Sequence, residues 1–184
     1  GGDQATEIKL TQDNSAPNGD HQNHARSNRA WVHLSQDRLL LPPHTTQKVP
    51  YTVAVPNGVP TGTYWSLLGV EPLLGESAES QMINPPGKVV FGVKQKIRYE
   101  INVMTHLGAG QSKITFSHPK LTTAPRGGKQ LQVMLANEGN RHARPTLSLE
   151  VFDSRGQRIK TLTGAKRGLY PDANKPFTVP LVGL

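Results

Sequence analysis

Histidine is the first residue type that could do chemistry in this chain, because an imidazole nitrogen can bind a metal ion. His21 and His24 lie three residues apart, and His33 and His44 follow at longer intervals. The first pair sits in an Asn-rich polar stretch, no cysteine accompanies it, and the spacing differs from known zinc patterns. We therefore expect solvated loop histidines, with no metal site and no other cofactor.

Patterns that would indicate catalysis are scarce. The chain has no cysteine nucleophile, no Gly-x-Ser-x-Gly elbow and no GxxxxGK[ST] phosphate loop. Its 13 acidic residues are spread thinly over 184 positions, which leaves few candidates for paired carboxylates. The sequence therefore predicts a protein that is not an enzyme.

The formal net charge of +8 raises the alternative of a polyanion partner such as nucleic acid. The basic residues are scattered along the chain and are not gathered in one run with interleaved aromatics. Nucleic-acid binding thus remains the less favoured alternative. A steep loss of binding with rising salt would identify it.

Aromatic residues could instead form a platform for a carbohydrate or a peptide, and Trp31, Tyr64 and Trp65 are the candidates. Large rings on alternating strands belong more often to the core, so we expect all three to be buried. By the same argument, Tyr170 is expected to lie under a turn begun by Pro171.

The elements that position these residues are predicted to be short strands. Hydrophobic residues make up 35% of the chain, and 18 Gly and 15 Pro interrupt it at short intervals. No stretch of 18 apolar residues and no charged-then-apolar leader occurs, so we expect neither a membrane-spanning protein nor an unprocessed precursor. The expected fold class is all-β, with two immunoglobulin-like β-sandwich domains.

Five strands are expected in the first half of the chain. Four candidates are Thr6–Thr11, Trp31–Leu34, Arg38–Leu41 and Val49–Val55, the last with strict period-two alternation; β-branched and aromatic residues favour the fifth at Thr63–Pro72.

The longest alternating run follows, and we expect it to divide at Gln95. The later residues of this run are predicted to lie in the core, and the earlier ones to be available for pairing with a partner. The later set is Ile97, Tyr99, Ile101 and Val103; the earlier set is Val89, Phe91 and Val93.

The second half repeats the alternation. Strands are expected at Lys113–Phe116 and Leu131–Leu135, followed by a turn in which Gly139 adopts a positive φ. A hairpin is expected from Leu147 to Ile159 with its turn at Asp153–Gly156, and a last strand carries the apolar residues Phe177, Val179 and Leu181.

A domain boundary is expected in the Gly-containing segment His106–Ser112, which gives domains 1–107 and 108–184. Each half offers about five strands, fewer than the seven of a complete immunoglobulin-like sandwich of about 100 residues. Either the sequence is a piece of a longer protein, or strands from a partner complete its sheets.

The segment from Trp31 to Pro72 resembles the first domain of the PapD-like periplasmic pilus-assembly chaperones and of related bacterial surface proteins, and the whole resemblance covers roughly Thr6 to Val103. A Trp opens one strand, an apolar strand ends in prolines, and a Pro, Gly and Tyr corner leads into the next strand. The matching positions are Trp31, Leu39–Pro43, Val49–Pro56, Pro60, Gly62 and Tyr64.

This resemblance implies an extracytoplasmic protein, in the bacterial periplasm or at the cell surface. In that family the last strand of the first domain lends apolar residues to an incomplete pilin subunit. The positions that match here are Val89, Phe91, Val93, Lys94, Lys96 and Arg98, with Lys96 at the basic position. The implied partner is a pilin-like or surface protein subunit, bound by strand pairing, and self-association through edge strands is a further expectation.

Departures from the family pattern keep two alternatives open. The family's first strand is absent, Asn102 and Val103 replace its closing Arg-Pro, and the second half does not match the chaperones' second domain closely. The long run then stands equally well as an ordinary core strand, and the protein as a structural module of a surface or wall-associated complex.

Overall fold

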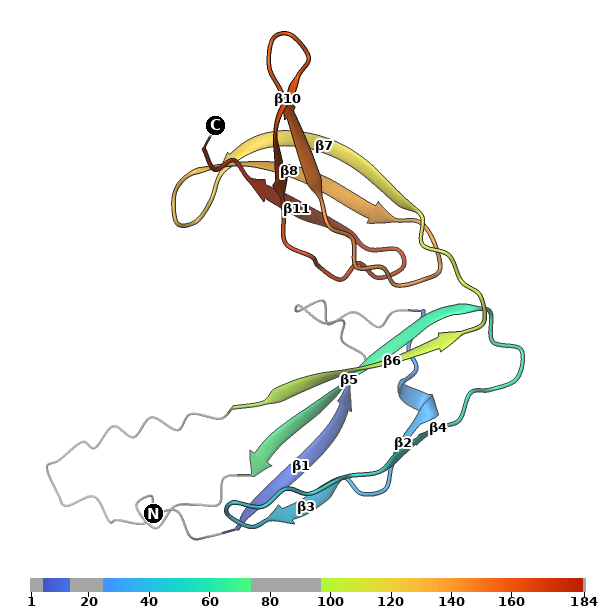
Figure 1. Ribbon diagram of the computed structural model, residues 1–184. Helices are drawn as coiled ribbons and strands as arrows, with labels where there is room; N and C mark the ends of the chain where they lie inside the picture. The colour runs from blue at the N-terminus through green and yellow to red at the C-terminus, as the bar shows by residue number, and fades with distance from the viewer. Residues whose placement is uncertain (1–4, 14–24, 74–96, 184) are drawn as a thin grey trace, which may run out of the picture. The chain divides into compact units, whose positions relative to one another are not determined.

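The computed structural model describes residues 5–13, 25–73 and 97–183, and these form an all-β structure (Figure 1). The chain divides into two compact units. Unit 1 comprises Gly1–Val59 and Tyr64–Thr105, and unit 2 comprises Pro60–Thr63 and His106–Leu184. No helix among the described residues is long and apolar enough to cross a membrane.

Unit 1 contains a larger antiparallel sheet with the strand order β3-β1-β5-β6. Strand β1 lies inside this sheet, where it pairs with β3 on one side and with β5 on the other. The strands are β1 (Thr6–Asp13), β3 (Arg38–Leu41), β5 (Gly62–Leu73) and β6 (Tyr99–Leu107). The strands predicted at Thr6–Thr11, Arg38–Leu41 and Thr63–Pro72 lie close to the bounds of β1, β3 and β5.

A smaller second sheet in unit 1 consists of β2 (Val32–Leu34) and β4 (Tyr51–Val53). The short 3-10 helix η1 (Arg29–Trp31) leads into β2 and brings Trp31 inside. Trp31 packs on Tyr64 with ring centroids 4.6 Å apart, and Trp65 is buried as well. The expectation that these three aromatics belong to the core is confirmed.

A buried asparagine ties the chain before η1 to the larger sheet. Asn28 is fully buried, and its side-chain Nδ2 donates hydrogen bonds to the Val103 carbonyl oxygen at 3.1 Å and to the Thr105 hydroxyl at 2.9 Å. Its backbone N–H donates to the Trp65 carbonyl oxygen at 3.3 Å. Asn28 thereby fixes the position of β6 from an element 75 residues earlier in the chain.

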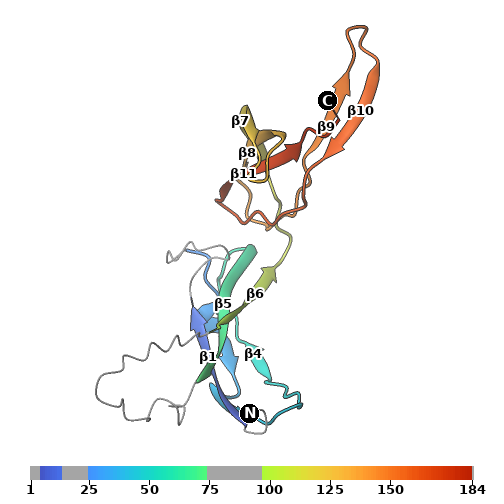
Figure 2. The ribbon, with the colours of Figure 1, turned by 90° about the vertical axis from the view of Figure 1, so that its left-hand side faces the viewer.

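Unit 2 contains a three-stranded antiparallel sheet with the order β11-β8-β7, and a separate two-stranded hairpin of β9 and β10 (Figure 2). The strands are β7 (Ile114–Thr123), β8 (Lys129–Asn137), β9 (Ser148–Phe152), β10 (Arg158–Thr163) and β11 (Asn174–Pro180). The hairpin confirms the predicted turn, since the Asp153 N–H donates to the Gln157 carbonyl oxygen at 2.9 Å.

Unit 2 has a buried core, although Phe116 and Leu121 of β7 and Ile159 of β10 are more than half exposed. Val133, Leu135, Leu169 and Phe177 form one buried cluster. Val179 is also fully buried, and so is most of Tyr170 at its predicted turn. The alternation at Val133 and Leu135 and at Phe177 and Val179 thus marks the inward face correctly.

Gly139 was predicted to adopt a positive φ in a turn, and this prediction was wrong. Gly139 does not have a positive φ. A glycine is needed there because a Cβ atom would collide with the Gln111 carbonyl oxygen and with the backbone of Lys113. The constraint is a close approach of two backbone segments, which local turn patterns do not reveal.

Residues Pro60–Thr63 belong to unit 2, although most of β5 belongs to unit 1. The Thr63 N–H donates to the Asn140 carbonyl oxygen at 2.8 Å, and Asn140 Nδ2 donates to the Thr61 carbonyl oxygen at 3.0 Å. The His142 N–H donates to the Thr63 hydroxyl at 2.9 Å. The predicted domains 1–107 and 108–184 did not include this contribution of residues before 108 to unit 2.

Candidate functional site

Strand β6 lies at one edge of the larger sheet, where β5 is its only partner among the described residues. Tyr99 is 65% exposed and Ile101 is 51% exposed, and Ile97 just before the strand is 50% exposed. The expectation that these side chains lie buried in the core was wrong. Val103, further along the strand, is half-buried.

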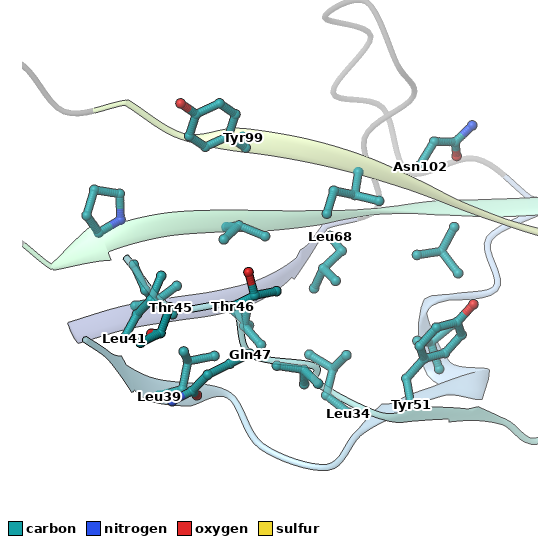
Figure 3. A pocket seen from close by; sticks show the side chains of 18 of the residues that line it. Leu34, Leu39, Leu41, Thr45, Thr46, Gln47, Tyr51, Leu68, Tyr99 and Asn102 are labelled. Carbon is teal, nitrogen blue, oxygen red and sulfur yellow. The ribbon is translucent and has the colours of Figure 1, made fainter. Parts of the chain in front are cut away.

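An open apolar cleft explains this exposure. A cavity of about 900 Å³ lies in unit 1, and Tyr99, Ile101 and Val103 line it. Figure 3 shows leucines from both sheets at the same space: Leu34 of β2 in the smaller sheet, and Leu39 and Leu41 of β3 and Leu68 of β5 in the larger sheet. The alternation of β6 therefore points to the sandwich interior as predicted, but no described residue covers that interior.

The two sheets of unit 1 differ in size, and this difference leaves the cleft open. A sandwich is closed when both layers place side chains against each other across about 10 Å. Here a four-stranded sheet faces only two short strands. The same deficit explains a further correction: the half-buried strand predicted for Val49–Val55 is reduced to β4, where Tyr51 and Val53 are both exposed.

Arg98 is the one predicted partner-binding residue that the structure describes. Its guanidinium lies 3.6 Å from the Asp13 carboxylate and 3.9 Å from that of Glu100. It also lies across Gly69, where an added Cβ would collide with it. Since side chains alternate along a strand, this face is opposite to that of Tyr99. Arg98 is thus held on the outer face of the sheet, away from the cleft.

The remaining predicted positions cannot be placed in the fold. Val89, Phe91, Val93, Lys94 and Lys96 lie outside the described residues, and so do the two histidines of the candidate metal pair. Among the residues that are described, no group of three His, Asp or Glu side chains is arranged to hold a metal ion.

A histidine pair in unit 2 was missed by the sequence analysis. His106 Nδ1 lies 2.9 Å from the hydroxyl of Thr63, and the ring of His142 packs on Tyr170 at 4.7 Å. Burial lowers the pKa of both imidazoles from the ordinary value of 6.5; Arg141 adds to the effect at His106, and His106 and Arg144 add to it at His142. These histidines are 36 residues apart in sequence, and no spacing rule connects them.

Comparison with solved structures finds fimbrial proteins among those of similar fold. One is a chain of a chaperone-tip adhesin complex of CFA/I fimbriae biogenesis, with a TM-score of 0.51 and 10% identity over 98% of this chain and 81% of that one. Another is the class 5 fimbriae chaperone CfaA, with a TM-score of 0.51 and 12% identity over 94% of this chain and 72% of that one.

At the level of sequence, no protein-family model and no curated protein matches the chain. The likeness to fimbrial chaperones therefore rests on how the strands are arranged. It extends over almost the whole chain, beyond the segment up to Val103 on which the sequence resemblance was based. The chain has the all-β, immunoglobulin-like sandwich fold that is found in fimbrial chaperones.

Proposed function

We propose that this protein is an extracytoplasmic, non-enzymatic binding protein of the fimbrial-chaperone type, which binds a pilin-like or surface subunit by β-strand addition. The observation that carries the proposal is the position of β6 as an edge strand with exposed apolar side chains. Edge strands template pairing with another chain, and soluble proteins ordinarily protect them.

Strand addition uses two kinds of contact, and β6 offers both. Main-chain hydrogen bonds give affinity, and alternate side chains in pockets give specificity. Ile97, Tyr99 and Ile101 form the apolar row, and their exposed fractions are at least one half. We include the preceding alternating residues Val89, Phe91 and Val93, with Lys94 and Lys96, in the proposed binding strand on the basis of sequence alone.

The two similar solved structures support a protein subunit as the partner. One of them is described as a chaperone-tip adhesin complex, and the other as a fimbriae chaperone. A protein that handles such subunits acts outside the cytoplasm, which is the basis for the proposed location.

Site-specific photo-crosslinking in the cells that make this protein tests the proposal. A benzophenone side chain in place of Tyr99 is expected to cross-link to a surface or fimbrial subunit, identified by mass spectrometry. Phe152 on the β9–β10 hairpin is the matched control, because it is also a large aromatic and is 53% exposed. The control position should give no such adduct.

A charge at the same two positions gives the second arm of the test. Tyr99→Glu should abolish recovery of the subunit with this protein while leaving the thermal midpoint nearly unchanged, because the side chain is already exposed. Phe152→Glu should change neither. Equal cross-linking at the two positions, or subunit binding that survives Tyr99→Glu, would contradict the proposed role of β6.

A further inference from the structure

The hydroxyl group of Thr63 joins parts of unit 2 that are far apart in the sequence. Thr63 is fully buried, and its Oγ1 accepts a hydrogen bond from the His142 N–H at 2.9 Å. The same Oγ1 lies 2.9 Å from Nδ1 of His106. Three segments therefore meet at one oxygen atom: the start of β5, the end of β6 and the loop after β8.

The number of donors and acceptors at this oxygen determines the direction of the histidine bond. A hydroxyl has one hydrogen to donate, and a buried donor without a partner is costly. Because the His142 N–H already donates to Thr63, the Thr63 hydrogen needs an acceptor of its own. Among the described residues, His106 Nδ1 provides that acceptor. His106 is then neutral, and its proton lies on Nε2.

Protonation of His106 removes this acceptor. Both ring nitrogens of an imidazolium are donors, so Nδ1 no longer accepts the Thr63 hydrogen. The Thr63 oxygen then faces two N–H donors, while its own hydrogen has no acceptor among the residues that the structure describes. If the charged ring turns toward solvent instead, the same hydrogen is left unpaired. Acid therefore breaks the bond in either case.

Arg141 opposes a positive charge on His106. Its guanidinium donates to the Gly108 carbonyl oxygen at 2.9 Å, and its charge adds to burial in lowering the pKa of His106 from 6.5. Glu138 lies in the same loop as Arg141, but its carboxylate pairs with the Lys113 ammonium at 2.8 Å. It is thus engaged elsewhere.

His142 has surroundings of the same sign. Arg144 and His106 both add to burial in lowering the pKa of its imidazole. The ring packs on Tyr170 at a centroid distance of 4.7 Å. A proton on either histidine would therefore place a further positive charge in a group of cations.

The Thr63 hydroxyl adds to the bonds that hold Pro60–Thr63 on the rest of unit 2. The Thr63 N–H donates to the Asn140 carbonyl oxygen at 2.8 Å, and Asn140 Nδ2 donates to the Thr61 carbonyl oxygen at 3.0 Å. These two bonds do not involve a titratable group. The bond to His106 does, so it makes the attachment of the segment depend on pH.

We propose that Thr63 and His106 form a pH-sensitive clasp, which holds Pro60–Thr63 on unit 2 while His106 is neutral and loosens when His106 takes up a proton. In the open form the imidazole has its ordinary pKa of 6.5, and in the closed form its pKa is lowered. The clasp therefore contributes fully above pH 6.5 and loses its contribution as the pH falls toward the lowered value. Nothing in this device depends on partner binding at Tyr99.

NMR of the histidine ring nitrogens in the 184-residue chain tests the direction of the bond. At pH 7.5, His106 should carry its proton on Nε2, and its pKa should lie below 6.5. Thr63→Val removes the hydroxyl that bonds to the neutral ring, so the pKa of His106 should rise. The control Thr63→Ser keeps the hydroxyl and should leave the pKa of His106 as in the native chain.

Amide hydrogen exchange tests the clasp itself. The measured exchange rate of the Thr63 N–H, divided by its intrinsic rate, should rise at least about threefold from pH 7.5 to pH 5.5. His106→Asn retains a side-chain acceptor that does not titrate, so this rise should fall below about 1.5-fold. The Gly164 N–H, which donates to the Leu147 carbonyl oxygen at 2.9 Å, is the control amide and should show no such rise.

Three results would overturn the inference. These are a His106 proton on Nδ1 at pH 7.5, the same pKa of His106 in Thr63→Val and the native chain, and an equal pH response of Thr63 exchange in His106→Asn and the native chain. The position of the His106 proton is measured on the native chain. It therefore decides the question even if a variant fails to fold.

Discussion

Strands β8 and β11 of unit 2 and strand β6 of unit 1 have the same alternating pattern but differ in how far their apolar side chains are buried. In unit 2, Phe177 and Leu135 are each only 1% exposed and pack within one cluster. In unit 1, Tyr99 and Ile101 alternate just as regularly but remain more than half exposed. Alternation determines which face of a strand is apolar, but burial of that face requires a second layer of sufficient size.

Unit 1 therefore has two regions of different character. Its buried core is centred on the aromatic residues Trp31, Tyr64 and Trp65. Its cleft is lined by aliphatic side chains that would be core residues in a complete sandwich. Exposed apolar surface of this kind marks sites of interaction with other molecules.

The largest expected effect comes from deleting matched apolar side chains in the two units. Phe177→Ala should lower the free energy of unfolding of unit 2 by about 3–5 kcal/mol, the cost of a large cavity in a packed core. Ile101→Ala should cost less than about 1 kcal/mol, because the side chain has little packing to lose. Hydrogen exchange in denaturant, followed separately in β11 and β5 peptides, measures each unit. Equal losses of unfolding free energy for Phe177→Ala and Ile101→Ala would mean that Ile101 is tightly packed and that the cleft is filled.

A smaller effect is expected at the buried asparagine of each unit. Asn137 accepts hydrogen bonds from the N–H groups of Lys113 and Gly139 and donates to the carbonyl oxygens of Arg141 and Leu169. Asn137→Ala removes these bonds from the two N–H groups and from the Arg141 carbonyl oxygen, whereas the Leu169 carbonyl oxygen still accepts from the Ala143 N–H. The substitution should destabilise unit 2 by about 3 kcal/mol.

Asn28 is the counterpart in unit 1, with side-chain bonds to Val103 and Thr105 only. Asn28→Ala should cost about 1–2 kcal/mol by the same reasoning. Tryptophan fluorescence reports this loss, since both tryptophans of the chain lie in unit 1. A larger loss of unfolding free energy for Asn28→Ala than for Asn137→Ala would show that unit 1 depends more on buried polar contacts than its open cleft indicates.

The smallest expected effect is the change in the stability of unit 2 with pH. Because the pKa values of His106 and His142 are lowered, the folded state binds fewer protons than the unfolded state. Their contribution to stability is complete above pH 6.5, the ordinary value, and is lost as the pH falls toward the lowered folded-state values. Thermal unfolding at pH 7.5 and 5.5 should show a smaller loss for His142→Gln than for the native chain. An equal loss would assign the pH dependence to other groups.

Much of the strand layout was predictable because it is written in local patterns. Arg38–Leu41 is a short apolar run followed by two prolines, and Asp153–Gly156 has the residues of a tight turn. The membership of Pro60–Thr63 in unit 2 was not predictable, since it depends on contacts with Asn140 about 80 residues away. The open cleft could not be predicted from the sequence either, because no local pattern indicates how many strands the opposite layer contains.

For the candidate site, the sequence indicated the correct strand but the wrong environment. The alternation of β6 predicted burial of Tyr99 and Ile101, and the structure places them at the cleft and at the edge. Arg98 lies on the other face in ion pairs with Asp13 and Glu100. Asn28, which positions β6, has no signal in the sequence beyond being a polar residue near an aromatic strand.

Amide hydrogen exchange along β4 in the isolated chain tests most directly whether unit 1 leaves its sandwich open. The bonding pattern predicts slow exchange at Thr52 and Ala54, whose N–H groups face β2, and fast exchange at Tyr51 and Val53, whose N–H groups face outward. Uniform protection of all four amides would show that another strand already covers this edge. That result would contradict the open cleft that the described residues of unit 1 form.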